Sequence, residues 1–173
     1  MNILKKFAGI KAFVFDVDGV LTDGTIALSS DGEMVRTMHT RDGYALQLAV
    51  KQGLEVIVIS GAVSSHVKIR LEKLGVHHVY MGTKDKLSKL KEVLHDTGLK
   101  AADLLFMGDD VPDIEAMQFC GFACAPKDAC TDVLEIADYI SPVPGGKGCV
   151  RDVIEKVMRL QDSWYFHPEI GSK

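Results

Sequence analysis

Two aspartates, Asp16 and Asp18, follow the apolar run Phe13–Phe15 within the stretch FVFDVDGVLTDG. Burying even one unpaired carboxylate is costly, so this pair at the end of a buried strand predicts a positive partner. Residues two apart on an extended chain point to the same side, about 6.6 Å apart, and we expect both carboxylates to flank one reacting centre. One carboxylate can act as a nucleophile that forms an aspartyl-phosphate, and the other can deliver or remove a proton.

Further polar residues follow or flank other apolar runs and are expected at the same edge. Each is weak evidence alone, because a strand-ending Asp or Ser often caps the next helix. Together they offer the hard oxygen ligands that Mg²⁺ prefers, with Asp16 and Asp109 as the best ligands, while Lys86 and Ser60 are expected to hold phosphoryl oxygens. The residues of this set are Ser60, Lys86, Asp109, Asp110 and Asp113.

The elements that position these residues alternate along the chain. Near-continuous apolar runs are typical of parallel strands covered on both faces, and helical spacing of Leu and Val separates them. This alternation predicts an α/β fold with a doubly wound, Rossmann-like, mostly parallel sheet and helices on both faces. The predicted strands are 11–16, 54–60, 77–82, 103–109 and 121–126, and the predicted helices are 42–53, 64–75, 86–98 and 148–160.

One segment, residues 25–39, interrupts the alternation and is typical of a β-hairpin around Asp31-Gly32. It should project from the edge where such sheets bind ligands. No interdomain linker is visible, so we predict one domain over residues 1–173. Its C-terminal tail, about 161–173, is expected to pack either against a neighbouring subunit or the site, or over its own core.

Composition excludes several classes of function. The chain has 173 residues, a formal net charge of −4 and no basic stripe with interleaved aromatics, so nucleic acid is not expected as a partner. No apolar run reaches the length of a membrane span and the N-terminus lacks a signal-peptide pattern; we therefore expect a cytoplasmic protein. The four cysteines do not form a zinc pattern and are expected to be reduced.

The quoted motifs carry a resemblance. DVDGVLTDG, Ser60, Lys86 and GDDVPD are similar, in order, to the four motifs of the haloacid dehalogenase superfamily. The resemblance implies Asp16 as the nucleophile and Asp18 as the general acid/base. It implies Mg²⁺ held by Asp16, the Asp18 backbone carbonyl and Asp109, with Asp110 or Asp113 in support. The hairpin and one helix fill most of the chain between Asp16 and Ser60, so no cap domain is expected.

Within that superfamily the chain resembles the 3-deoxy-D-manno-octulosonate 8-phosphate phosphatase family, which also has the hairpin and a Gly-rich segment like PGGKGCVRDV. This resemblance implies a sugar-acid phosphate substrate, a role in lipopolysaccharide precursor synthesis, and a homotetramer whose subunits cover each other's sites. A phosphatase for the nine-carbon 2-keto-3-deoxy-nononate 9-phosphate is the alternative. Ala62 stands where members often have a charged residue. Candidate substrate-binding residues are Gly61, Arg70, Lys73, Lys147 and Arg151.

Two readings from other classes are weaker. A phospho-receiver module also has a doubly wound fold and an Asp that accepts a phosphoryl group, but that Asp follows the third strand, where this chain has Met81-Gly82. A non-catalytic regulatory module would not need the complete set of reactive residues. The sequence therefore favours an Mg²⁺-dependent phosphoric monoester hydrolase.

Overall fold

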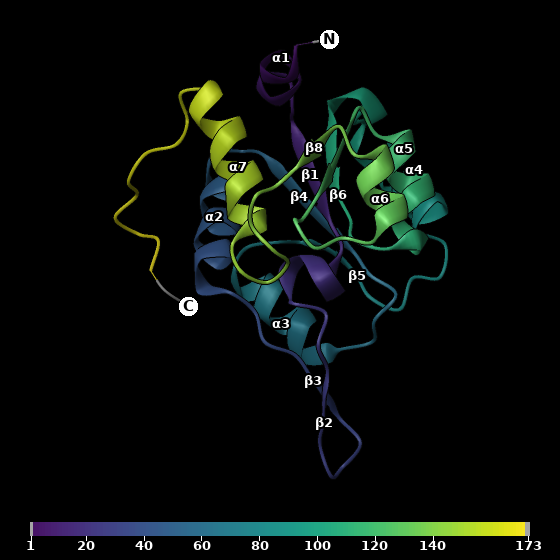
Figure 1. The fold of residues 1–173 in the computed structure, drawn as a ribbon. Helices are drawn as coiled ribbons and strands as arrows, with labels where there is room; N and C mark the ends of the chain where they lie inside the picture. The colour runs from purple at the N-terminus through teal and green to yellow at the C-terminus, as the bar shows by residue number, and fades with distance from the viewer. Residues whose placement is uncertain (1, 172–173) are drawn as a thin grey trace.

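A parallel sheet forms the centre of the molecule (Figure 1). The computed structural model describes residues 2–171; positions 1 and 172–173, at the ends of the predicted domain and tail, lie outside the described residues. The strand order is β5-β4-β1-β6-β7-β8, and every paired strand is parallel to its neighbour. Because β1 lies between β4 and β6, the carboxyl ends of these three strands share one edge. The strands are β1 (Ala12–Phe15), β4 (Glu55–Ile59), β5 (His78–Tyr80), β6 (Leu104–Met107), β7 (Phe122–Ala125) and β8 (Tyr139–Ile140).

Helices cover both faces of this sheet (Figure 1). Successive side chains of β1 show the division, because Phe13 and Phe15 belong to one core cluster and Ala12 and Val14 to the other. A strand buried on both faces must be apolar throughout, and the predicted doubly wound fold is confirmed. The first face carries α1 (Ile3–Ala8), α2 (Thr40–Lys51), α3 (Ser65–Lys73) and α7 (Cys149–Leu160), and the second carries α4 (Lys86–Thr97), α5 (Ile114–Phe119) and α6 (Thr131–Ile136).

The boundaries of the predicted helices have local causes. At the start of α3, the Ser64 hydroxyl accepts a hydrogen bond from the Val67 N–H at 3.3 Å. At the start of α4, the Asp85 carboxylate accepts a hydrogen bond from the Ser88 N–H at 2.8 Å. Helix α4 ends at Gly98, whose φ of 73° lies in the left-handed region that favours glycine. Side-chain caps and glycine stops therefore fix where these helices begin and end.

The predicted hairpin is present and consists of the antiparallel strands β2 (Ala27–Leu28) and β3 (Met34–Val35). It projects beyond the sheet on the side of α3 (Figure 1). Within residues 2–171 the chain between β1 and β4 forms only a short turn, the hairpin and α2, and the chain between β4 and β5 contains α3 as its only helix. The expectation that no cap domain follows the first or second motif is confirmed for this part of the chain.

Three short α-helices and one short strand were not predicted from the sequence. Helices α1, α5 and α6 have six residues each, and β8 has two. Segments of this length do not complete enough turns or alternations to show a hydrophobic period. None of the described helices is long and apolar enough to cross a membrane.

The C-terminal segment covers its own chain. The Trp164 ring lies edge-on to Tyr44 of α2, with 6.2 Å between centroids, and the Arg151 guanidinium of α7 stacks over it at 5.2 Å. Ile170 is 8% exposed and belongs to the core cluster, and the Gln47 amide donates to the Gly171 carbonyl at 3.2 Å. Within one chain, the described tail residues pack over α2 and α7, as in the prediction that the tail covers its own core; its packing against a neighbouring subunit stays a prediction.

Candidate active site

Acidic side chains from the ends of β1 and β6 meet at the carboxyl edge of the sheet. Asp16 directly follows β1 and Asp109 follows β6 by one residue, and these strands are paired neighbours. One oxygen from each of Asp16, Asp109 and Asp113 lies within 4.8 Å of the others. The structure therefore brings together the carboxylates that the sequence predicts as a metal site.

Lys86 supplies positive charge inside this cluster. Its ammonium donates a hydrogen bond to Asp113 Oδ1 at 2.6 Å and lies 3.0 Å from Asp16 Oδ1 without hydrogen-bond geometry. The Lys86 side chain is 6% exposed. Burial opposes its charge, but the charges of Asp16 and Asp113 raise the pKa of Lys86 above its usual value. Lys86 thus stays protonated and offsets part of the negative charge.

The charge of Lys86 does not fully offset the negative charge of the clustered carboxylates, because the pKa values of Asp16 and Asp109 stay raised. Burial raises the pKa of Asp16 to about 6, with repulsion from Asp113 adding to it and Lys86 opposing it. Burial and the charge of Asp16 raise the pKa of Asp109 to about 7. Asp16 Oδ1 and Asp109 Oδ1 are buried and accept no hydrogen bond from the described residues. Two buried carboxylate oxygens that accept no hydrogen bond, in a cluster whose charge Lys86 offsets only in part, fit a divalent cation with oxygen ligands.

The two predicted supporting aspartates differ in their surroundings. Asp113 is 1% exposed, and its Oδ2 accepts hydrogen bonds from the N–H groups of Asp109 at 3.1 Å and Asp110 at 3.4 Å. Asp110 is exposed, and its own Oδ1 accepts from the Val111 N–H at 2.8 Å. Asp113 therefore shapes the loop that carries Asp109 while it holds Lys86, whereas Asp110 lies at the rim.

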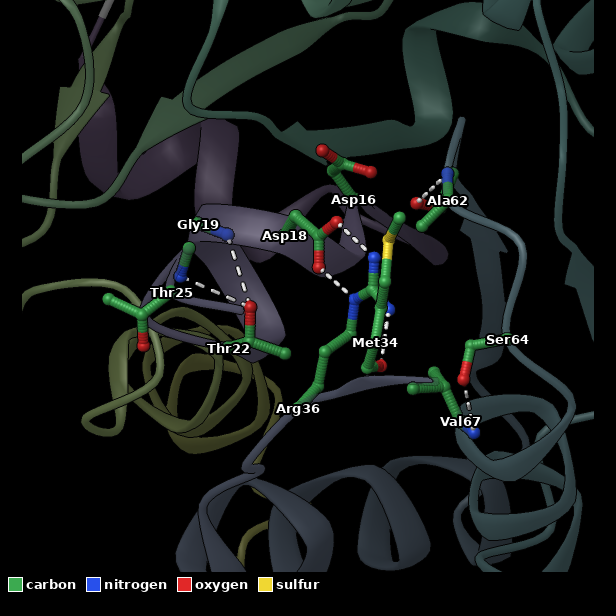
Figure 2. Close-up of polar contacts among 12 residues, drawn as sticks. Asp16, Asp18, Gly19, Thr22, Thr25, Met34, Arg36, Ala62, Ser64 and Val67 are labelled. Carbon is green, nitrogen blue, oxygen red and sulfur yellow. Dashed lines mark hydrogen bonds and ion pairs between the residues drawn. The ribbon is translucent and has the colours of Figure 1, made fainter. Parts of the chain in front are cut away.

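The loop after β1 is folded tightly against this cluster. Its residues Val17–Leu21 form one irregular helical turn in which Gly19 has a φ of 84°. A Cβ at Gly19 would lie 1.9 Å from Asp109 Oδ2, so only glycine fits there. The buried Thr22 hydroxyl accepts hydrogen bonds from the N–H groups of Gly19 at 3.3 Å and Gly24 at 3.2 Å (Figure 2). Small residues thus let the loop approach the acidic cluster.

Asp18 faces a partner that the sequence did not indicate. Strand β1 ends at Phe15, so the extended geometry assumed for the first motif does not continue to Asp18. The guanidinium of Arg36, just after β3, binds the Asp18 carboxylate through Nε at 2.6 Å and Nη2 at 3.0 Å (Figure 2). Asp16 and Asp18 still line one cavity. Nothing in the spacing of Arg36 marks it as a site residue.

That cavity has a volume of about 500 Å³ and opens next to a larger one of about 1020 Å³. The larger cavity lies between the hairpin and α3 and holds none of the clustered carboxylates, so the chemistry belongs to the smaller one. Gly61 and Ala62 line both. Ser60 is buried, and its Oγ accepts from the Ala62 N–H at 3.2 Å. The smaller cavity is also lined by Lys84, which the sequence reasoning missed.

Only some of the candidate substrate-binding residues line these cavities. Arg70 lines the larger cavity. Lys73 is exposed on α3 and lines neither. Lys147 pairs with Asp23 at 3.3 Å, and Arg151 pairs with Glu155 at 3.0 Å beneath the tail. Within one chain, Gly61 and Arg70 are the members of this set that lie at the site.

The Gly-rich segment packs against the loop after β1. A Cβ at Gly145 would lie 1.9 Å from the Gly19 carbonyl oxygen. The N–H of the next residue, Gly146, donates to the Val20 carbonyl at 2.9 Å. The absence of side chains at these glycines is therefore a packing requirement of the active-site loop.

Comparisons with known proteins identify the family of the chain. A family model described as haloacid dehalogenase-like hydrolase matches residues 63–151. KdsC of Escherichia coli (strain K12), a 3-deoxy-D-manno-octulosonate 8-phosphate phosphatase, is 32% identical over 92% of this chain and 85% of its own length. The chain belongs to the haloacid dehalogenase-like hydrolase family. Among its relatives, this hydrolase resembles the 3-deoxy-D-manno-octulosonate 8-phosphate phosphatases.

Solved structures give the same result for the hydrolase. The phosphatase from Yersinia pestis superposes with a TM-score of 0.90 at 31% identity, over 93% of this chain and 87% of that one. The phosphatase from Moraxella catarrhalis, in complex with magnesium ion, phosphate ion and KDO, has a TM-score of 0.89 at 34% identity, over 92% of each chain. The chain is a phosphoric monoester hydrolase, and Mg²⁺ is its cofactor, which fits the buried oxygens of Asp16 and Asp109 that accept no hydrogen bond from the described residues.

Proposed function

We propose that this hydrolase removes phosphate from a sugar-acid phosphate, and that the substrate is 3-deoxy-D-manno-octulosonate 8-phosphate. The observation that carries the proposal is the pair of adjoining cavities, one lined by the carboxylates and Lys86 and the other by Arg70. When the phosphoryl group lies in the smaller cavity, the sugar acid attached to it extends past Gly61 into the larger cavity. The named activity of the relatives supports the same substrate.

The proposed reaction has two steps. The Asp16 carboxylate attacks phosphorus, the bond from phosphorus to the sugar oxygen breaks with its electron pair on oxygen, and Asp18 gives that oxygen a proton. Water then attacks the phosphorus of the aspartyl-phosphate while Asp18 takes a proton from it, which releases phosphate and restores Asp16. The proximity of both carboxylates to one cavity supports these roles.

We propose that Asp16, the Asp18 backbone carbonyl and Asp109 hold the cofactor, with Asp110 and Asp113 in support. When bound, Mg²⁺ neutralises charge on the phosphoryl oxygens and the carboxylates. Lys86 and Ser60 are the proposed contacts for the phosphoryl oxygens. Lys86 can make that contact while it remains bonded to Asp113, because an ammonium has three donors.

The sugar-acid end needs cationic partners, since Arg matches the planar geometry of a carboxylate. Arg70 and Gly61 are the proposed contacts within the chain. Lys73, Lys147 and Arg151 remain proposals that require a neighbouring subunit, because they lie outside the two cavities of one chain.

The experiment that tests this function compares steady-state phosphate release from the eight-carbon substrate with that from 2-keto-3-deoxy-nononate 9-phosphate. We expect a higher kcat/KM for the eight-carbon compound and no turnover after Mg²⁺ is chelated. A higher kcat/KM for the nine-carbon compound would contradict the substrate, and turnover without Mg²⁺ would contradict the mechanism.

We further propose that residues 1–173 act as one phosphatase domain. We place this domain in the cytoplasm and in lipopolysaccharide precursor synthesis.

We also propose that the protein is a homotetramer. The hairpin supports the assembly, because its apolar side chains are exposed in the single chain, with Leu28 at 78% and Met34 at 55%. Light scattering tests it. Leu28→Ser should lower the measured mass, whereas Leu4→Ser, a 56% exposed leucine on α1, should not; a wild-type monomer would contradict the proposal.

A further inference from the structure

The hairpin reaches the active site through one buried arginine. Arg36 follows β3 directly, and its side chain is only 4% exposed, although the hairpin strands beside it are exposed. Its Nε and Nη2 each face a different oxygen of Asp18, at 2.6 and 3.0 Å (Figure 2). This fork-to-fork geometry fixes both the position and the plane of a carboxylate, which a single donor does not.

The contacts of Arg36 favour a role through Asp18 over direct contact with a substrate. Its Nη1 donates to the Met34 carbonyl at 3.0 Å, so each of the three guanidinium nitrogens makes one hydrogen bond. Arg36 is among the residues that line the larger cavity, but only 4% of its side chain is exposed, so little surface is left for a substrate to contact. Asp18 is 31% exposed and lines the smaller cavity. The carboxylate therefore meets the substrate, and the arginine holds it from behind.

We propose that Arg36 is the positioning residue of the reaction, which orients the Asp18 carboxyl group for proton transfer to the leaving oxygen. This inference rests on the proposed function. The turn Val17–Leu21 has an irregular backbone, with φ and ψ outside helical values at Asp18 and Gly19, and it does not by itself fix the direction of the Asp18 side chain. A carboxyl group that delivers a proton must lie within hydrogen-bond reach of its target. Arg36 supplies this constraint from the hairpin.

The two kinds of leaving group separate this role from a merely structural one. A sugar alkoxide leaves poorly unless it is protonated as the phosphorus–oxygen bond breaks, whereas the nitrophenolate of para-nitrophenyl phosphate leaves without a proton. The value of kcat/KM reports the steps up to departure of the leaving group. Misorientation of Asp18 should therefore lower kcat/KM for the sugar phosphate selectively.

The test measures kcat/KM of wild type and variants on both substrates. Arg36→Met should lower kcat/KM for the sugar-acid phosphate by about tenfold to a hundredfold, which is part of the roughly hundredfold to ten-thousandfold that general acid catalysis contributes. It should leave kcat/KM for para-nitrophenyl phosphate little changed. Arg36→Lys keeps the charge but loses the fork, so it should fall between. The matched control is Arg159→Met, which removes an exposed arginine that binds Glu155 through Nε at 2.9 Å and Nη2 at 2.7 Å on α7.

Binding of Mg²⁺ alone, measured by calorimetry, should be the same in Arg36→Met and wild type, because Arg36 binds the side chain of Asp18 and not its backbone carbonyl, which is the proposed ligand, and contacts none of the clustered carboxylates. Equal losses on both substrates, or weakened Mg²⁺ binding, would overturn the inference and leave Arg36 as a structural anchor. Unchanged kinetics would overturn it as well. A wild-type enzyme that hydrolyses neither substrate would refute the proposed function itself, and with it the role of Asp18.

Discussion

Two regions of the molecule each bury a carboxylate, and the two carboxylates have different roles. Asp16, at the sheet edge, is 7% exposed, and Asp42, on α2, is 1% exposed. Burial raises the pKa of each to about 6, and each keeps one oxygen without a hydrogen-bond partner among the described residues. Burial and a raised pKa therefore do not distinguish a reactive carboxylate from a structural one.

The surroundings do distinguish them. Asp16 lies beside Lys86 and two more carboxylates and lines the cavity of about 500 Å³. Asp42 lines neither cavity, and its Oδ1 accepts the N–H of Arg151 in the first turn of α7 at 2.7 Å. This hydrogen bond satisfies one of the N–H groups left without a partner at a helix N-terminus, so Asp42 joins α2 to α7. Access and convergent charges, and not burial, indicate chemistry.

The largest expected effect comes from a change at Asp16, the member of this pair that lines a cavity. Asp16→Asn removes the proposed nucleophile and should lower phosphate release by roughly a thousandfold or more, while thermal unfolding stays cooperative because the amide is nearly isosteric. The control is Asp132→Asn, which alters an exposed aspartate in the first turn of α6 and should leave turnover unchanged. Substantial activity in Asp16→Asn would remove Asp16 from its role.

The sequence could predict the cluster at the sheet edge but not the contacts of Asp18 and Asp42. Apolar runs that end in Asp16 and Asp109 reveal strands, and parallel neighbouring strands bring such ends together. The partner of Asp18 lies 18 residues away across a hairpin, and that of Asp42 lies 109 residues away across two packed helices. Such pairs depend on how elements pack, which no local pattern encodes.

The predicted substrate-binding residues show the same limit. Arg70 and Lys73 are three residues apart on one helix, yet only Arg70 lines a cavity. Their cationic type was visible in the sequence, but the direction each side chain takes depends on how α3 is rotated against the sheet. The helical period places Val67 and Leu71 in the core, and it does not indicate which part of the opposite face borders the hairpin.

The second prediction concerns Asp42, the buried carboxylate that lines neither cavity. Since burial raises the pKa of Asp42 from 3.8 to about 6, its protonated form stabilises the fold. That contribution is fully present below about pH 4 and is lost as the pH rises through about 6, a change of about 3 kcal/mol at about 1.4 kcal/mol per pKa unit. Asp42→Asn does not titrate and keeps an oxygen for the Arg151 N–H.

Urea unfolding without Mg²⁺ measures this difference. The free energy of unfolding of wild type relative to Asp42→Asn should fall between about pH 4 and about pH 7, while Asp132→Asn should show no comparable trend relative to wild type. A difference between wild type and Asp42→Asn that is constant with pH would show that Asp42 does not titrate in this range. Because Asp42 lines neither cavity, kcat for the variant should stay near that of wild type at neutral pH.

The smallest expected effect links the two regions. Gly145 precedes α7 and touches the loop that carries Asp18, where an added Cβ would lie 1.9 Å from the Gly19 carbonyl oxygen. Gly145→Ala must displace one of these backbones, and we expect a loss of about 1–3 kcal/mol in the free energy of unfolding. Because a small displacement of a reacting group is costly, kcat/KM should fall by about tenfold.

Gly171→Ala is the matched control, since an added Cβ there meets none of the described residues within 4 Å and should change neither quantity. Gly145→Ala and Asp42→Asn alter the same end of α7 by different routes, so their kinetics can be compared directly. If only Gly145→Ala lowers kcat/KM, the active-site loop depends on steric contact with the Gly-rich segment and not on the Asp42 charge. If both lower it equally, the start of α7 acts as one unit with the site, and the division between a reactive and a structural carboxylate would have to be abandoned.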